Sequence, residues 1–434
     1  MTTHSIFHRA SLAADMRIVG RGELSLDQLI DSFEIRFKSV EPTVEAFLSE
    51  ADRFGRLRRD ADSLAAQYPD PASRPPLYGA LLAVKDIFHV DGYTTRAGSR
   101  LPPSLFAGAE ANVVTRLKKA GALVIGKTVT TEFAYFEPGP TRNPHNLAHS
   151  PGGSSSGSAA AIAAGLAHIT LGTQTVGSVI RPAAYCGLVG FKPSFGRVDT
   201  AGLVLFSPSA DHVGFFTSDI ADMQVVCAAV IDNWNNRPAP EKRPVLALPV
   251  GAYLEQSTAL DCLEAQLDAL EAAGYEIKRV PLFHNIATID ACHQDLIAGE
   301  LALQHREWFA RYSGRYRPRT AALIQHGQTV SPQRLKAARE HQLKLRERLH
   351  VVMEAEGIDL WICPSAPDVA PRGLGATGSP AMNMPWTHAG LPAVSVPARR
   401  GKLGLPLGLQ LVSRFGKDEA LLRWAGGIES AFKD

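Results

Sequence analysis

Apolar residues near the start of the chain recur every three or four positions. They are Leu26, Leu29, Ile30, Phe33 and Phe37. This spacing places them on one side of a helix and predicts an amphipathic helix with a buried apolar face. Ser25 stands just before this pattern, and Gln28 follows three residues later. The pair predicts a capping box, in which each side chain accepts a hydrogen bond from a backbone N–H of the first turn.

Further segments carry helical spacing or the residues that begin and end helices. They are 111–120, 159–166, 258–273 and a long basic segment from Ser331 and Pro332 to about residue 356. Serine followed by proline is typical of a helix start, because the serine caps the helix and proline fits its first position. We expect the basic side of this last helix to face solvent.

Short apolar runs separate these helices. The runs are 81–84, 122–125, 275–280, 360–363, 393–396 and 407–412. Runs of this length between turn residues are typical of buried strands. Because helices and strands alternate along the chain, the sequence predicts an α/β fold.

The composition is typical of an enzyme with a large core. Of the 434 residues, 45% are hydrophobic and 20% are charged, and the net charge is +2. This balance favours neither nucleic acid nor a membrane as a partner. The five cysteines are scattered without the paired spacing of a zinc site, so we expect free thiols and a cytoplasmic protein. The N-terminus lacks the apolar stretch of a signal peptide.

Three known motifs occur in contexts that do not suit them. Residues 121–128 match the P-loop, but the residues between its glycines are themselves a predicted strand. Residues 373–378 match a dinucleotide fingerprint but lie among prolines. Residues 153–157 match the nucleophile elbow of α/β-hydrolases, with Ser155 as the nucleophile, although no strand precedes them. We interpret the first two matches as coincidences and keep Ser155 as an alternative nucleophile.

The segment from 151 to 190 is rich in Gly, Ser, Thr and Ala and poor in charge. Small residues let backbone N–H groups approach a reacting atom closely, so this composition suggests a site of hydroxyls and main-chain donors. A serine needs a base to become a nucleophile. No histidine near this segment stands in a pattern with an Asp and a Ser. Those considered are His89, His145, His149, His168 and His212.

Lys85 is the other candidate base. It follows a predicted buried strand and precedes Ile87 and Phe88. Burial disfavours the charged ammonium, so we expect the pKa of Lys85 to be lowered. The competing interpretation is structural, since a lysine beside Asp86 at a strand end commonly forms a salt bridge. The residues alone leave both interpretations open.

Several ordered motifs together resemble the amidase signature family of serine hydrolases. Ser178 follows Gly177 and precedes Pro182 by four residues, Ser154 is the first serine after Pro-Gly-Gly, and Lys85 begins a Lys-Asp pair. Further blocks resemble the family at 120–128, 187–193, 211–214, 390–397 and 404–410. The resemblance covers about residues 75–220 and 358–430.

This resemblance implies a central mixed β-sheet covered on both faces by α-helices, in a single domain over 1–434. Within that domain the expected parts are an N-terminal helical segment (1–75), the signature core (75–220), a variable, mostly helical insert (235–350) and the C-terminal part of the core (358–430).

The resemblance also implies a catalytic triad. Ser178 would attack an amide carbonyl, and its proton would pass through Ser154 to neutral Lys85. The peptide bond between Gly153 and Ser154 would be cis, and no metal or organic cofactor would be needed. The oxyanion would be held by the backbone N–H groups of Thr175, Val176, Gly177 and Ser178.

The sequence departs from the family pattern at three positions. Gln174 replaces an aspartate, Val176 replaces a glycine, and Ile180 stands where the family has an arginine. Arg181 comes one place later, and one residue rotates a helical side chain by about 100°. Arg181 is therefore not expected to take the family arginine's role. The joint loss of both charges suggests that the aspartate and the arginine pair in relatives.

The implied activity is hydrolysis of an amide, carbamate or aryl amide bond through an acyl-enzyme on Ser178, releasing a carboxylate and an amine or ammonia. Candidate apolar walls of the pocket are Phe133, Tyr135, Phe206 and Trp386. The first expectation is a free-standing monomer or homodimer that acts on a small molecule. The alternatives are the glutaminase subunit of a tRNA-dependent amidotransferase and a scaffold without activity.

Overall fold

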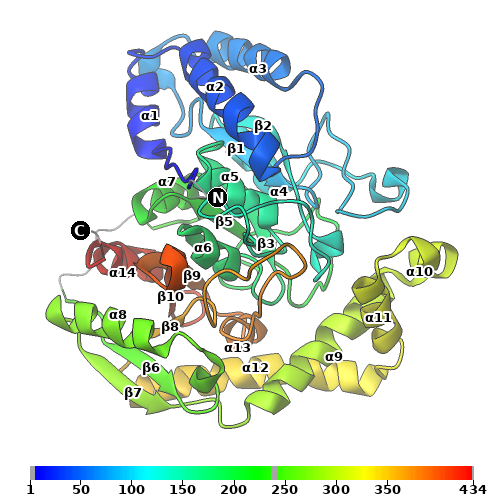
Figure 1. Ribbon diagram of the computed structural model, residues 1–434, viewed down its shortest axis with the longest axis vertical. Helices are drawn as coiled ribbons and strands as arrows, with labels where there is room; N and C mark the ends of the chain where they lie inside the picture. Colours follow the sequence, from blue (N-terminus) through cyan, green and yellow to red (C-terminus); the bar gives the residue numbers. More distant parts are fainter. Residues whose placement is uncertain (1–4, 236–241, 433–434) are drawn as a thin grey trace.

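Ten strands form one mixed sheet in the computed structural model, which describes residues 5–235 and 242–432. The first four residues and the start of the expected insert, 236–241, lie outside the described residues. The strand order is β2-β1-β3-β5-β4-β9-β10-β8-β6-β7, and the sheet runs from the top to the bottom of Figure 1. The strands are β1 (Leu81–Lys85), β2 (Leu123–Thr128), β3 (Ile169–Gln174), β4 (Val189–Lys192), β5 (His212–Thr217), β6 (Leu246–Val250), β7 (Ile277–Pro281), β8 (Leu360–Pro364), β9 (Ala393–Arg400) and β10 (Pro406–Val412).

The sheet is parallel at its two ends and antiparallel between them. Strand β1 pairs in parallel with both β2 and β3, and β6 pairs in parallel with β7 and β8. The strands from β3 through β5, β4, β9 and β10 to β8 pair antiparallel. This arrangement confirms the mixed sheet that the family resemblance implied.

Helices cover both faces of the sheet. Successive residues of a strand point to opposite faces; in β1, Leu82 and Val84 pack into one apolar core, and Leu81 and Ala83 into another. The second core also receives the apolar sides of α2, α5 and α6, and the first those of α4, α7 and α14. The described helices are α1 (Leu12–Gly20), α2 (Leu26–Val44), α3 (Arg53–Gln67), α4 (Asn112–Lys119), α5 (Ser156–Ala163), α6 (Ile180–Cys186), α7 (Ile220–Val230), α8 (Leu260–Ala272), α9 (Ile286–Gln304), α10 (Arg306–Tyr312), α11 (Pro318–Gly327), α12 (Pro332–Ala355), α13 (Met384–His388) and α14 (Asp418–Ser430).

The helix signals in the sequence correspond to helices in the structure. The capping box of α2 is present, since Ser25 Oγ accepts from Gln28 N at 3.1 Å and Gln28 Oε1 accepts from Ser25 N at 2.9 Å. At the start of α12, Ser331 Oγ alone acts as the cap by accepting from the backbone N–H of Arg334. Helix α8 begins at Leu260, two residues after the expected start.

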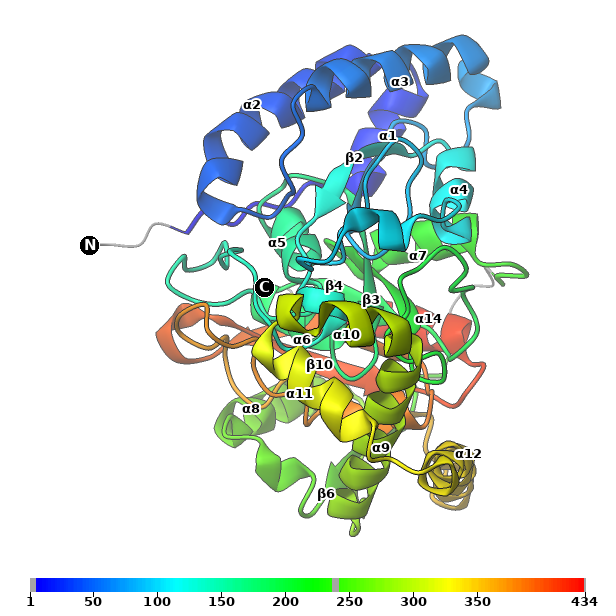
Figure 2. The ribbon, with the colours of Figure 1, turned by 90° about the vertical axis from the view of Figure 1, so that its right-hand side faces the viewer.

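The segment expected to be a mostly helical insert also contributes strands. Strands β6 and β7 extend the sheet beyond β8 (Figure 1). Strand β6 was not predicted from the sequence, because Pro249 interrupts its apolar run and proline within a run argues against a strand. Helices α9 and α12 lie at the opposite end of the molecule from α2 and α3 (Figure 2). Because one sheet spans the described chain, we propose that it is a single domain.

The topology brings two segments of the candidate site to one edge of the sheet. Strands β1 and β3 are parallel neighbours, so their carboxyl ends lie at the same edge. Lys85 ends β1, and residues Thr175 to Ser178 follow β3 directly. We call these four residues the oxyanion turn. The fold therefore brings the candidate base close to the oxyanion turn, although the two are far apart in the sequence.

Two further sequence expectations can be compared with the structure. All five cysteines are free. Among the described residues, no helix combines the length and the apolar character that crossing a membrane requires.

Replacing Ser25 with alanine should lower the free energy of unfolding by about 1 kcal/mol, because it removes the side-chain acceptor at the start of α2. Chemical unfolding of both proteins in urea measures the difference. Ser63→Ala is the matched control, since Ser63 is an exposed serine inside α3. That variant should be neutral or slightly more stable, because alanine has the higher helix propensity. Equal losses in the two variants would contradict the capping role.

Candidate active site

Lys85 is buried completely and is surrounded by hydroxyl groups. Its Nζ lies 2.7 Å from Ser154 Oγ and 2.8 Å from Thr173 Oγ1. Burial lowers the pKa of Lys85 well below its usual 10.5, and the nearby Asp211 opposes this shift only in part. This shift favours the neutral amine, which can accept a proton from a hydroxyl.

The neighbouring carboxylate does not pair with Lys85. Asp86 forms its ion pair with Lys127, whose Nζ lies 2.8 Å from Asp86 Oδ1. Lys127 also donates to the carbonyl oxygen of Phe88 at 2.7 Å. The salt-bridge interpretation of Lys85 is therefore wrong, and the lysine of the accidental P-loop match has a structural role. The P-loop residues themselves form β2.

Ser154 follows a cis peptide bond from Gly153, as the family resemblance implied. The carbonyl oxygen of Gly153 accepts a hydrogen bond from the guanidinium of Arg181 at 2.6 Å. Ser155 has a different place: it is buried, and its Oγ contacts the backbone of Thr173 at 3.3–3.4 Å. Ser155 therefore packs against strand β3.

Ser178 and Ser154 line the same cavity, which has a volume of about 10 Å³. Ser178 is 8% exposed, and no described residue forms a hydrogen bond with its hydroxyl. Nor does any described residue accept a hydrogen bond from the backbone N–H groups of the oxyanion turn. Buried N–H groups are rarely left without acceptors, so this turn is suited to hold a negatively charged oxygen.

Gln174 takes over a structural task at the start of α6. Its Oε1 accepts from the backbone N–H groups of Val179 at 2.8 Å and Ile180 at 3.0 Å. These are among the N–H groups that have no acceptor within a helix. Positions 174 and 180 are thus close together, as the paired replacement of charges requires. A neutral amide can cap the helix without a charged partner.

Two of the four expected pocket residues line the cavity. Tyr135 and Phe206 stand in its wall and stack with their ring centroids 5.7 Å apart. The structure places the other two elsewhere. Phe133 packs against Phe106 and other aromatic rings, and Trp386 is fully buried with its Nε1 donating to Tyr253. Both rings fill apolar cores instead of the cavity, because aromatic content alone does not distinguish a core from a wall.

Several residues of the candidate site were not predicted from the sequence. Phe136 lines the cavity, and so does Arg181, for which no place in the site was predicted. Asp211 accepts from Thr175 Oγ1 at 2.5 Å and from Phe206 N at 2.8 Å, so it ties the oxyanion turn to the wall. The Asp211 block at 211–214 was a recognised motif without an assigned role.

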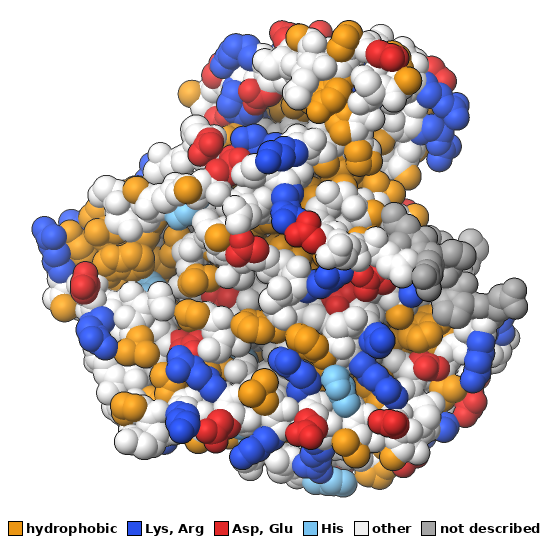
Figure 3. All heavy atoms as spheres, turned by 180° about the vertical axis from the view of Figure 1, so that it is seen from behind, with side chains coloured by type: hydrophobic (Ala, Val, Ile, Leu, Met, Phe, Trp, Pro, Cys, Tyr) orange, Lys and Arg blue, Asp and Glu red, His pale blue; other side chains and the backbone are white. Residues whose placement is uncertain are grey.

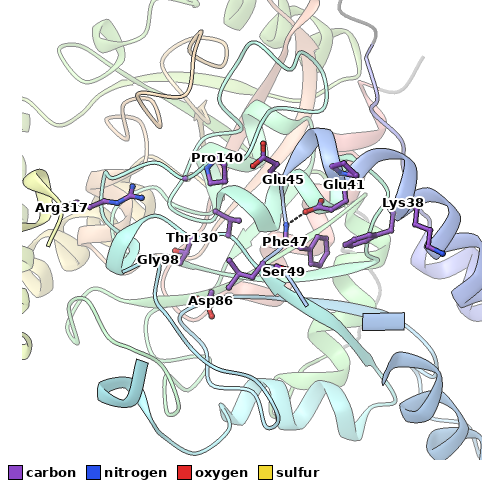
Figure 4. Close-up of a pocket in the computed structure, with 15 residues that line it drawn as sticks. Lys38, Glu41, Glu45, Phe47, Ser49, Asp86, Gly98, Thr130, Pro140 and Arg317 are labelled. Atoms are coloured by element: carbon purple, nitrogen blue, oxygen red, sulfur yellow. Dashed lines mark hydrogen bonds between the residues drawn. The ribbon is translucent and has the colours of Figure 1, made fainter. Parts of the chain in front are cut away.

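A larger cavity lies beside the end of β1 and does not contain the triad candidates. Its volume is about 640 Å³, and its walls include Phe37, Phe47, Asp86 and Arg317 (Figure 4). Glu41 belongs to this cavity and accepts from the backbone N–H of Phe47 at 2.7 Å (Figure 4). The described residues contain no group of three or more side chains arranged to hold a metal ion.

Residues 28–422 match the family model named Amidase. The chain belongs to the amidase family. Amidase family members hydrolyse carbon–nitrogen bonds, and this protein is a hydrolase of that class. A crystal structure described as that of an amidase superposes with a TM-score of 0.88 at 28% sequence identity, covering 98% of this chain and all of the other. The peptide amidase from Stenotrophomonas maltophilia, at 24% identity and a TM-score of 0.81, shares the fold.

Among curated proteins, this amidase is similar to the A subunit of glutamyl-tRNA(Gln) amidotransferase. The proteins of that name from Synechococcus sp. (strain WH7803) and from Geobacter metallireducens (strain ATCC 53774 / DSM 7210 / GS-15) are each 32% identical, with 95% of each chain covered. That name describes one subunit of an amidotransferase for glutamyl-tRNA(Gln). This contradicts the expectation of a monomer or homodimer with a small-molecule substrate and no nucleic acid. Net charge misled that expectation, because it averages over the whole surface and says nothing of partner subunits.

Replacing Lys127 with methionine should destabilise this amidase by about 3–5 kcal/mol, because it leaves Asp86 buried without its partner. Urea unfolding measures the loss, and Lys127→Met combined with Asp86→Leu should recover part of it. Because the P-loop match lies in strand β2 and not in a phosphate-binding loop, ATP should not raise the unfolding temperature of the wild type. A rise with ATP, or a loss below about 1 kcal/mol, would contradict the structural role of Lys127.

Proposed function

We propose that Ser178 is the nucleophile of this amidase, Ser154 the proton relay and Lys85 the general base. The hydrogen bond of 2.7 Å between the buried Lys85 amine and Ser154 carries this proposal. Neither group has a carboxylate partner among the described residues, so the amine can cycle between neutral and protonated forms. Ser178 shares its cavity with Ser154 and stands beside N–H groups that have no acceptor.

The reaction follows from these positions. Ser178 Oγ attacks the amide carbonyl while its proton passes to Ser154 Oγ, and the Ser154 proton passes to Lys85 Nζ. The oxyanion accepts hydrogen bonds from the oxyanion turn, where each donor is worth about 3 kcal/mol in other hydrolases. The relay then returns the proton to the leaving nitrogen, and the C–N bond breaks. Water attacks the acyl-enzyme by the same route and releases the carboxylate.

For the substrate, we propose a primary carboxamide whose molecule also carries a carboxylate, with glutamine as the first compound to test. Arg181 supports this choice. Arg181 lines the cavity, and its guanidinium is bonded only to the carbonyl oxygens of Gly153 and Gly378 and to Thr377, with no acidic partner in the described chain. Burial lowers the pKa of Arg181 to about 10, so it stays positive at pH 7. Such a charge attracts an anionic substrate.

The curated relatives are named as the A subunit of an amidotransferase, and we propose that this chain works as the amide-hydrolysing subunit of such an enzyme. On the face shown in Figure 3, Lys and Arg side chains are interspersed with Asp and Glu. A tRNA would find no continuous basic surface on this face, and we propose that partner subunits contribute to its binding. The free cysteines support a cytoplasmic location.

A fluorophosphonate should label Ser178 in the wild type and not in Ser178→Ala, as mapped by peptide mass spectrometry. Only neutral Lys85 accepts a proton, so the labelling rate should rise with pH through the Lys85 pKa. Because that pKa is depressed, the rate should level off well below pH 10.5. Lys85→Met should label about 10²–10⁴-fold more slowly. Ser155→Ala is the control and should label at the wild-type rate; an adduct on Ser155 would overturn the assignment.

Ammonia release from glutamine should exceed that from butyramide, which has the amide but no carboxylate, by about tenfold or more, since one charge-assisted contact is worth about 1.5–3 kcal/mol. Arg181→Met should remove this preference, and Arg181→Lys, which keeps the charge, should retain part of it. The amidotransferase role further requires that glutamine turnover rise when partner subunits and glutamyl-tRNA are added. Full turnover by the chain alone, unchanged by these additions, would favour a free-standing amidase.

A further inference from the structure

Three histidines outside the signature segment form a chain of hydrogen bonds that ends on the oxyanion turn. His341 Nδ1 lies 2.9 Å from His388 Nε2, and His388 Nδ1 lies 3.1 Å from His293 Nδ1. His293 Nε2 lies 3.1 Å from the carbonyl oxygen of Thr175. The three rings belong to α12, α13 and α9. Helices of the 235–350 segment thus reach the turn that follows β3.

The carbonyl at the end of this chain sets the direction of every bond. A carbonyl oxygen only accepts, so His293 Nε2 must carry the hydrogen. Burial lowers the pKa of His293 to about 4 and that of His388 to about 2, so both rings are neutral at pH 7 and each has one donor and one acceptor. His388 therefore donates from Nδ1 to His293, and His341 donates from Nδ1 to His388. One arrangement of protons satisfies all three bonds.

The contact with Thr175 also orients a donor of the oxyanion turn. The carbonyl of Thr175 and the N–H of Val176 belong to one planar trans peptide group, in which they point in opposite directions. Holding the oxygen therefore fixes the direction of the N–H. The next peptide group is held similarly, because Thr387 Oγ1 donates to the carbonyl oxygen of Val176 at 2.7 Å. That second group carries the N–H of Gly177.

We propose that His293 is a positioning residue that aims the Val176 N–H at the oxyanion, while His388 and His341 keep its Nε2 in the donor form. The inference rests on the proposed function, since it requires the turn to hold the oxyanion. It also accounts for a valine in place of glycine at this point. The branched side chain of Val176 limits the backbone torsions of the turn, and the hydrogen bond from His293 fixes the peptide group before Val176 from outside the turn.

Labelling of Ser178 by a small alkyl fluorophosphonate tests the role of His293. In His293→Leu the maximal labelling rate should fall about 10- to 100-fold, somewhat less than the loss of a whole oxyanion donor. The probe concentration that gives half the maximal rate should stay unchanged, because the cavity wall is intact. His293→Gln, whose amide nitrogen can donate to Thr175, should label within about threefold of the wild type. A purely structural role would not be rescued in this way.

His168→Leu is the matched control, because His168 is equally buried but binds Leu81 N and Asp15 far along the chain from the turn. It should lower the unfolding temperature and leave the labelling rate unchanged. If His293→Leu does not fold, His388→Leu takes its place, with an expected loss of about three- to tenfold. Wild-type labelling rates in folded His293→Leu, or in His388→Leu, would overturn the role of the chain. Absence of any adduct on wild-type Ser178 would instead overturn the proposed function itself, and this inference with it.

Discussion

The proposed active site depends on one constraint: the Lys85 amine is fully buried, and its hydrogen-bond partners are two hydroxyl groups and no carboxylate. Burial disfavours the charged ammonium, and the nearby Asp211 offsets this only in part, so the pKa of Lys85 is lowered and the amine is suited to act as a base. The adjacent Asp86 would remove this property if it turned toward Lys85, and Lys127 prevents that by binding it. The two lysines thus have separate partners: Lys127 binds the carboxylate of Asp86, and Lys85 binds two hydroxyl groups. This separation explains the arrangement of β1, β2 and the loop after β1.

Much of this architecture could be predicted from the chain. Helix α2 and its capping box, helix α12 and the apolar strands β1, β8, β9 and β10 follow from local spacing and end signals. Strand β6 could not be predicted, because Pro249 breaks its pattern, and β3 to β5 are hidden in segments rich in Gly and Thr. The candidate triad residues were found through motif resemblance and not from local pattern. Two of the four aromatic residues expected to line the pocket do so, and two do not. The sequence does not reveal whether a ring fills a core, as Phe133 does, or lines a cavity, as Tyr135 does.

The largest gap between sequence and structure concerns contacts over long chain separations. Arg181 reaches the carbonyl oxygens of Gly153 and Gly378, and His293 reaches that of Thr175. None of these contacts has a local signal, since each joins a side chain to a backbone group far along the chain. Gln174 shows the same limit on a smaller scale: its substitution was visible, but its role as the acceptor at the start of α6 required coordinates. Catalytic groups are thus easier to find in a sequence than the residues that hold them in place.

The link between α9, α12 and the oxyanion turn bears on how this protein can be recombined with its relatives. Segment 235–350 is the natural unit to exchange in a chimera, because it lies between the two parts of the core that carry the family motifs. Such an exchange would remove His293 and His341 while leaving Thr175 and His388 behind. A graft would therefore have to bring its own donor for the Thr175 carbonyl. Exchange boundaries chosen from the strands alone would miss this requirement.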